Sequence, residues 1–173
     1  MTTNIYFSNT SGGLSMSDTY DFGTVTPGNY SSPVDVFIRH DAVNAKITNC
    51  AFYVARCMSE SYDGDDPNSD LIELLGFGDS DKGFQINQTI PVGWTEGDEF
   101  GSSDWDSFKN GHGDINNKIA LSEDAISIGA VDGASIAVGG EAHIQFRYYI
   151  PSSVSAGAGN RGISMVFAYD ATS

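Results

Sequence analysis

An acidic segment contains the residues best suited to bind a metal ion. The stretch "DGDDPNSD" holds four aspartates within eight residues, namely Asp63, Asp65, Asp66 and Asp70. Carboxylate oxygens at this density can gather around a hard cation such as Ca²⁺. The EF-hand register fails, because Leu71 stands where that loop needs Gly and Phe77 where it needs Glu. We therefore expect a solvated acidic loop, with these four aspartates as the first suspects if calcium proves to bind.

The three histidines are spaced too widely to predict a metal site. None of His40, His112 and His143 lies four residues from another, and none has a cysteine within three residues. Helical zinc motifs need such short spacings between their ligands. His143 falls on the polar side of an alternating segment. We expect it to be solvated or hydrogen-bonded rather than metal-bound.

Two tryptophans lie among acidic residues, which is how sugar sites are built and also how loops are anchored to a core. Trp94 and Trp105 have five carboxylates nearby, at Glu96, Asp98, Glu99, Asp104 and Asp106. A retaining glycosidase needs two carboxyl groups about 5 Å apart, a distance that spacing alone does not give. Because Phe84, Phe100 and Phe108 are also close in sequence, we expect both tryptophans to anchor the segment by packing.

Motifs for nucleotide binding and nucleophilic catalysis fail on their structural context. The stretch "GAGNRG" over residues 157–162 has the G-x-G-x-x-G spacing, but a strand-like segment follows it where a helix is required. The stretch "GDSDKGF" lacks the lysine of a P-loop, and no G-x-S-x-G pattern occurs. The sequence therefore predicts a protein that is not an enzyme and that binds no cofactor.

Composition favours one globular domain over residues 1–173. Hydrophobic residues make up 40% of the chain, whereas Lys and Arg number only 8, and the formal charge is −15. Such an acidic chain repels phosphate backbones, so we expect no nucleic-acid partner. No apolar run is long enough to span a membrane and no secretion signal is visible, so we expect no membrane partner and folding in a host cytoplasm.

The elements that must position these residues are strands. Alternation of apolar and polar residues, and turn chemistry around it, predict six main strands, over residues 4–9, 20–25, 33–39, 47–57, 141–150 and 162–169. Weaker strands are predicted over 84–89, 118–122, 125–131 and 134–138. A tight turn is predicted at 26–29, a hairpin connection at 151–161, one short helix at 68–76 and a long loop excursion at 76–113.

Alternation also assigns side chains to faces. In the last two main strands we expect Ala142, Ile144, Phe146, Tyr148 and Ile150, and also Ile163, Met165, Phe167 and Tyr169, to point inward. If residues 47–57 form one strand, Cys50 and Cys57 lie on opposite faces about 23 Å apart, because each residue advances about 3.3 Å. A disulfide needs Cα atoms within about 7 Å, so we expect two free thiols.

Two stretches resemble immunoglobulin-like domains of the abnormal-spindle (ASH) type. Over residues 20–50, the family's strand, glycine turn and serine are matched by Phe22, Gly23, Val25, Gly28 and Ser31. Residues 136–169 resemble the closing hairpin of the same sandwiches. The segment Arg39 to Asp41 departs from the family, which has Asn and Gly there. The resemblance implies an immunoglobulin-like or jelly-roll β-sandwich with a scaffolding or adhesion role, and it transfers no catalytic residue.

The composition of the chain, acidic and rich in Gly, Ser and Asn, resembles that of bacteriophage virion proteins. We therefore expect a non-enzymatic virion protein that decorates or cements a capsid, as a homo-oligomer, with a trimer expected, bound to the major capsid protein. A tail or baseplate component is the alternative, and a carbohydrate-binding adhesin module is the alternative of another class. The expected partner contacts come from two groups of residues. The N-terminal strand or arm within residues 1–19 contributes Ile5, Tyr6 and Phe7, and the basic residues are Arg39, Arg147 and Arg161.

Overall fold

The computed structural model describes residues 5–12, 19–41, 46–59, 83–88, 105–108, 118–121, 126–130, 136–150, 152 and 161–172. These residues form an all-β sandwich of antiparallel strands, and no helix occurs among them. The strands are β1 (Ile5–Ser8), β2 (Val34–His40), β3 (Lys46–Ser59), β4 (Phe84–Asn87), β5 (Trp105–Ser107), β6 (Ile119–Ala120), β7 (Ile126–Ala130), β8 (Ile136–Tyr148) and β9 (Arg161–Thr172). The predicted all-β fold is confirmed.

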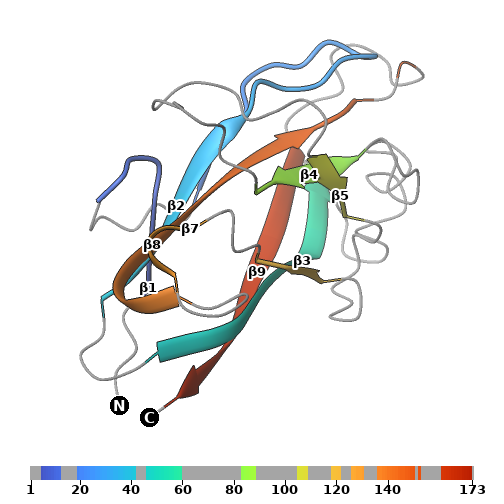
Figure 1. Cartoon of the computed structure of the whole chain (residues 1–173). Helices are drawn as coiled ribbons and strands as arrows, with labels where there is room; N and C mark the ends of the chain where they lie inside the picture. The colour runs from blue at the N-terminus through green and yellow to red at the C-terminus, as the bar shows by residue number, and fades with distance from the viewer. Residues whose placement is uncertain are drawn as a thin grey trace.

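The strands form two hydrogen-bonded layers (Figure 1). One layer has the order β1-β2-β8-β4-β5, with β7 on the same side of β8 as β4. The other has the order β9-β3-β6. Aromatic rings connect the layers, since Phe52 of β3 meets Phe146 of β8 at 5.4 Å and Phe7 of β1 meets Phe167 of β9 at 5.6 Å between centroids. β9 therefore lies over β1, and β3 over β8.

Strand β8 belongs to both layers. Its first residue, Ile136, pairs with Ile47 of β3, whereas its later residues pair with β2 and β4. Between these parts Gly139 has a φ of 74°, a left-handed value that side chains other than glycine's rarely adopt. The glycine allows the strand to turn out of one layer into the other. This turn closes the layers around a shared core.

The core is aliphatic at its centre and aromatic toward β4. Fully buried residues come from four strands and include Ile38, Ile47, Ile86 and Ile144. Phe84 stacks on both Phe108 and Phe146, and the Phe108 and Phe146 rings meet at a tilt. Phe84 and Phe108, which lie near the two tryptophans in sequence, thus belong to the main core. The main driving force for this arrangement is the removal of apolar surface from water.

The predicted strand over residues 20–25 does not form. Gly23 adopts a φ of 69°, and its backbone N–H donates to Asp21 Oδ1 at 2.8 Å, which is a local turn in place of a strand. The segment still packs against the core through Tyr20, Phe22 and Val25. Its apolar spacing thus reflects burial without sheet pairing.

The connection over residues 151–161 is not a hairpin. β8 pairs with β2 and β4, whereas β9 pairs with β3, so the chain crosses from one layer to the other between them. Alternation gives the inward face of a strand but not its neighbour. In β9 the alternation holds for Met165 and Phe167, which pack against the core, whereas Tyr169 is 38% exposed beyond the core's edge.

Other predictions are confirmed at the level of the element. The turn at 26–29 forms, with Asn29 N–H donating to the Thr26 carbonyl at 3.1 Å and Gly28 at a φ of 86°. The excursion over 76–113 contributes β4 and β5 to the sheet, so it is not wholly a loop. The predicted helix at 68–76 lies outside the described residues.

Both cysteines lie on the single strand β3. Cys50 is a free, fully buried thiol, as predicted, and burial raises its pKa to about 12. Asn49 before it has a φ of 53°, and β3 carries irregularities between Thr48 and Ala51 and between Val54 and Arg56. The side chain of Cys57 lies outside the described residues.

Candidate functional site

The layer formed by β1, β2, β8, β4 and β5 has a second face, turned away from the β3–β9 layer, that is polar yet mostly buried. Pairing registers place on one side the side chains that we call the polar face, namely Asp35, Phe37, Arg39, Gln85, Asn87, Glu141, His143, Gln145 and Arg147. Glu141, His143 and Gln145 are at most 2% exposed, and Asn87 is fully buried. Buried polar groups at this density need hydrogen-bond partners.

The centre of the polar face is a carboxylate that receives two side chains. Asp35 Oδ1 lies 2.9 Å from His143 Nε2 and accepts a hydrogen bond from Gln145 Nε2 at 2.9 Å. The His143 ring stacks on Phe37, with centroids 4.0 Å apart and planes within 10°. The imidazole is thus fixed in both position and tilt. His143 is hydrogen-bonded, one of the two predicted outcomes, but it is not solvated.

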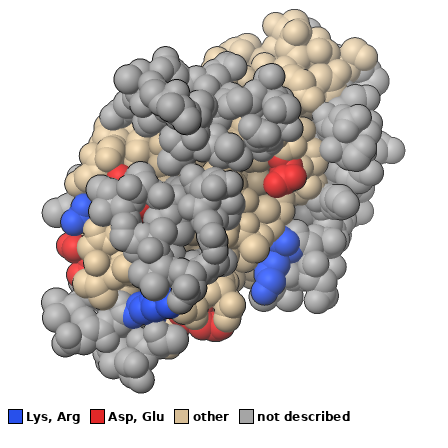
Figure 2. Space-filling model, viewed as in Figure 1, with Lys and Arg blue, Asp and Glu red and all other residues tan. Residues whose placement is uncertain are grey.

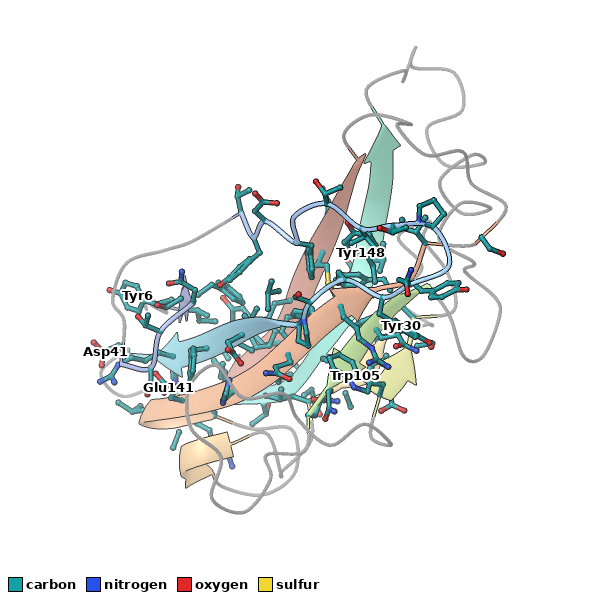
Figure 3. All side chains as sticks on the ribbon, turned by 90° about the horizontal axis from the view of Figure 1, so that it is seen from above. Tyr6, Tyr30, Asp41, Trp105, Glu141 and Tyr148 are labelled. Carbon is teal, nitrogen blue, oxygen red and sulfur yellow. The ribbon has the colours of Figure 1, made fainter. Side chains whose placement is uncertain are left out.

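One end of the polar face is an arginine between two aromatic rings. The Arg147 guanidinium carbon lies 4.0 Å from the centroid of Tyr30 and 4.0 Å from that of Trp105. Its Nε donates to Gln85 Oε1 at 2.8 Å, and Gln85 Nε2 donates to Ser107 Oγ at 2.9 Å. Figure 3 shows Tyr30 and Trp105 at the same end of the sheet. This end is a cation–π stack that joins β8, β5 and the turn before β2.

The stack bears on the sugar-binding hypothesis for Trp105. The Trp105 ring is half-buried against Arg147, as expected for an anchor that acts by packing. Backbone hydrogen bonds hold the Tyr30 turn against the end of β8, since Gly28 N–H donates to the Ile150 carbonyl at 2.7 Å. Trp94 and Phe100 lie outside the described residues.

The other end of the polar face holds the segment that follows β1. Glu141 is 1% exposed, and its carboxylate accepts from Ser11 Oγ at 2.8 Å and from Gly12 N–H at 2.7 Å. In Figure 3 this end of the sheet carries Tyr6, Asp41 and Glu141, opposite the end that carries Tyr30. Glu141 therefore fixes the N-terminal strand and its turn to β8.

The polar face is arranged for holding rather than for transferring protons. A general base must reach a substrate, but His143 is 1% exposed and covered by Phe37. His40 belongs to the opposite, apolar face and is fully buried, and its ring nitrogens have no partner among the described residues. No group of three or more metal-ligating side chains occurs in the described part of the chain. His112 and the aspartates at 63, 65, 66 and 70 lie outside it.

Burial also shifts two tyrosines that pack at the margin of the core. Burial raises the pKa of Tyr20 to about 12, and burial followed by the negative charge of Asp21 raises the pKa of Tyr148. Both hydroxyls thus stay protonated over an extended pH range. Neither is poised to act as a base near neutral pH.

The structure places two of the three predicted basic contact residues far from each other. Arg39 lies at one end of the polar face, 3.6 Å from Asp41, whereas Arg147 lies at the other end within the aromatic stack. Arg161 begins β9, and its side chain lies outside the described residues. Figure 2 shows the described basic side chains of that view as separate patches. Arg39 and Arg147 therefore lie at opposite ends of the polar face.

A second candidate surface is the side of the sandwich where both layers end, which we call the open flank and which consists of β1 and β9. Within the described residues β1 pairs only with β2, and β9 pairs only with β3. Ile5, Tyr6 and Phe7 are half-buried there, as is Phe167. Among the described strands, β1 and β9 therefore lie at the edges of their layers. The predicted hairpin of β8 and β9 would have paired β9 with β8, whereas the structure pairs it with β3.

Comparison with known proteins adds no relative. No family model, no curated protein and no solved structure matches this chain. The part of the chain that is described contains no helix long and apolar enough to cross a membrane.

Proposed function

We propose that the protein is a non-enzymatic structural module that adds to a larger assembly, with decoration of a bacteriophage capsid as the setting. The open flank is the observation that supports this proposal best. Edge strands present unpaired backbone donors and acceptors, and proteins that stay monomeric usually cover or interrupt them. Here two such strands lie one over the other, joined by the contact between Phe7 and Phe167. An added strand from a neighbour would extend either layer.

The polar face is consistent with such a role. Its buried groups hold one another in place, so they stabilise the sheet without leaving a reactive group exposed. The charge of −15 would keep free subunits soluble until they dock and would present an acidic surface to solvent. The proposed partners are further copies of the chain and the major capsid protein.

Co-sedimentation with undecorated capsids tests the proposal. The purified protein should pellet with shells at a saturating stoichiometry, and it should raise the temperature at which the shells disassemble, because a ligand that binds only the assembled state stabilises it. Serum albumin, another acidic protein, serves as the control for trapping. Failure to bind shells, with immunogold labelling confined to tails, would replace capsid decoration with the tail or baseplate alternative.

A further inference from the structure

The structure points to β9 as a self-pairing edge: we propose that β9 of two copies pair antiparallel across a two-fold axis, so that the β9-β3-β6 layer continues from one subunit into the next. β9 has 12 residues, about 40 Å of extended chain. Its only strand partner among the described residues is β3. No described strand pairs with the other edge of β9, and in the proposed dimer this edge supplies the backbone hydrogen bonds of the interface.

β9 lacks several of the features by which natural edge strands avoid pairing. Short length, proline, lysine and bulges are the usual ones. The sequence "RGISMVFAYDAT" contains neither proline nor lysine. The two irregularities of the β3–β9 pair place their extra residues on β3, which leaves β9 regular. β1, by contrast, has only 4 residues, so it offers a much shorter edge for pairing than β9.

The distribution of charge selects a second copy as the partner. Residues 162–169 carry no charge, although the chain as a whole carries −15. Two such acidic bodies can approach closely only where the facing surfaces are uncharged. A basic partner would gain nothing from this edge and would instead favour the acidic surface elsewhere.

The end residues of β9 fit a symmetric pairing. A two-fold axis perpendicular to the sheet sets one residue of β9 opposite its own counterpart. With Val166 on the axis, Asp170 falls opposite the partner's Gly162 and next to the partner's Arg161, at both ends of the interface. No like charges face each other in this register, and opposite charges at neighbouring positions attract.

Mass measurement by light scattering tests the pairing. The wild-type protein should have the mass of two chains, and Val166→Lys should have the mass of one, because it places two like charges at the axis. The matched control is Val138→Lys, the same change at a 47% exposed valine of β8, which should remain dimeric. Circular dichroism confirms that both variants fold. A monomeric or trimeric wild type, or a folded Val166→Lys that stays dimeric, would overturn the inference.

A cysteine scan gives a second test, which does not require the interface between the two β9 strands to be disrupted. Ser164, Val166 and Ala168 alternate with the core-facing Met165 and Phe167, so each can be changed to cysteine, in a Cys57→Ser background, without entering the core. Paired strands bring the two Cα atoms of the residue on the axis within disulfide range. Oxidation should cross-link one position strongly and positions two residues away weakly. Uniform or absent cross-linking would refute a fixed register.

The inference is independent of the capsid setting. If a Val166→Lys monomer still binds shells, capsid decoration is retained and must use another surface. If the dimer forms but does not bind shells, β9 pairing is retained and capsid decoration is rejected. A trimer was the expectation from the sequence, whereas β9 pairing produces dimers or assemblies built from them.

Discussion

The two faces of β8 are both buried but are stabilised in different ways. Toward β3 the strand presents Ala142, Ile144 and Phe146, which fill space beside other apolar side chains. Away from β3 it presents Glu141, His143 and Gln145, whose polar atoms meet specific partners. The stability of the apolar face depends on how well its side chains fill space, whereas that of the polar face depends on hydrogen-bond geometry. Loss of side-chain volume should therefore destabilise the apolar face, and loss of one hydrogen-bond acceptor should destabilise the polar face.

The difference matters because the two kinds of burial tolerate change differently. An apolar core accepts substitutions that keep total volume, whereas a buried polar group that loses its partner retains its full cost of desolvation. The polar face therefore specifies one arrangement of β2, β8 and β4 more strictly than the core does. We infer that it sets the register of the layer that carries β1 at its edge.

The largest effect is expected from Phe146→Ala. The Phe146 ring contacts Phe52, Phe84 and Phe108, so its removal opens a cavity where the two layers meet. Truncation of a buried phenylalanine typically costs about 3–5 kcal/mol of unfolding free energy. Urea denaturation measures the loss. Val138→Ala, at an exposed residue of the same strand, should change stability by less than about 0.5 kcal/mol.

A smaller loss is expected from Asp35→Ala on the polar face. The change removes the acceptor that serves both His143 and Gln145, and two buried donors lose that partner. The expected cost is about 2–3 kcal/mol, measured by the same denaturation. Asp41→Ala, which removes only an exposed pair with Arg39, should cost less than about 1 kcal/mol. Equal losses in the two variants would show that the polar face contributes no more than a surface ion pair.

Sequence alternation predicted the composition of these faces but not their burial. Alternate residues of a strand share a face, so His143 lies with Gln145 and Arg147, and Asp35 with Phe37 and Arg39, as the structure has them. Polar residues on one face of a strand usually meet solvent, so exposure was the natural expectation. Whether a polar face is covered depends on segments distant in sequence. The Asp35–His143 contact joins residues 108 positions apart, and no local pattern encodes such a pairing.

The errors in strand pairing have a similar cause. Residues 20–25 have the apolar spacing of a strand, yet the turn between Asp21 and Gly23 prevents one. β8 and β9 are neighbours in sequence and both alternate, yet they belong to different layers because β8 turns at Gly139. Period and composition locate strands, whereas a few residues with left-handed backbone decide where each strand goes.

Alkaline pH offers a way to weaken the apolar side alone. Burial raises the pKa of Cys50 from 9.0 to about 12, so the folded state favours the neutral thiol. The stability that the folded state gains from this preference is fully present below pH 9 and is lost as the pH rises toward 12. By about pH 10 the loss should reach about 1 kcal/mol. Thermal denaturation across this range should show the decline, and Cys50→Ala should flatten it. An unchanged slope in that variant would assign the decline to the tyrosines.

The smallest effect is expected from Arg147→Lys, which tests whether the end of the polar face depends on stacking or on charge. Lysine keeps the positive charge and can still donate to Gln85, but a compact ammonium group cannot cover Tyr30 and Trp105 at once. We expect a loss of about 1 kcal/mol, with a red shift in tryptophan fluorescence as water reaches Trp105. Arg39→Lys, at the opposite end and without a stack, should lose less and leave the spectrum unchanged. If both variants lose the same stability and neither shifts the tryptophan emission, charge alone stabilises this end of the polar face. Hydrogen-bond and stacking geometry would then matter only at the centre of the polar face, around Asp35.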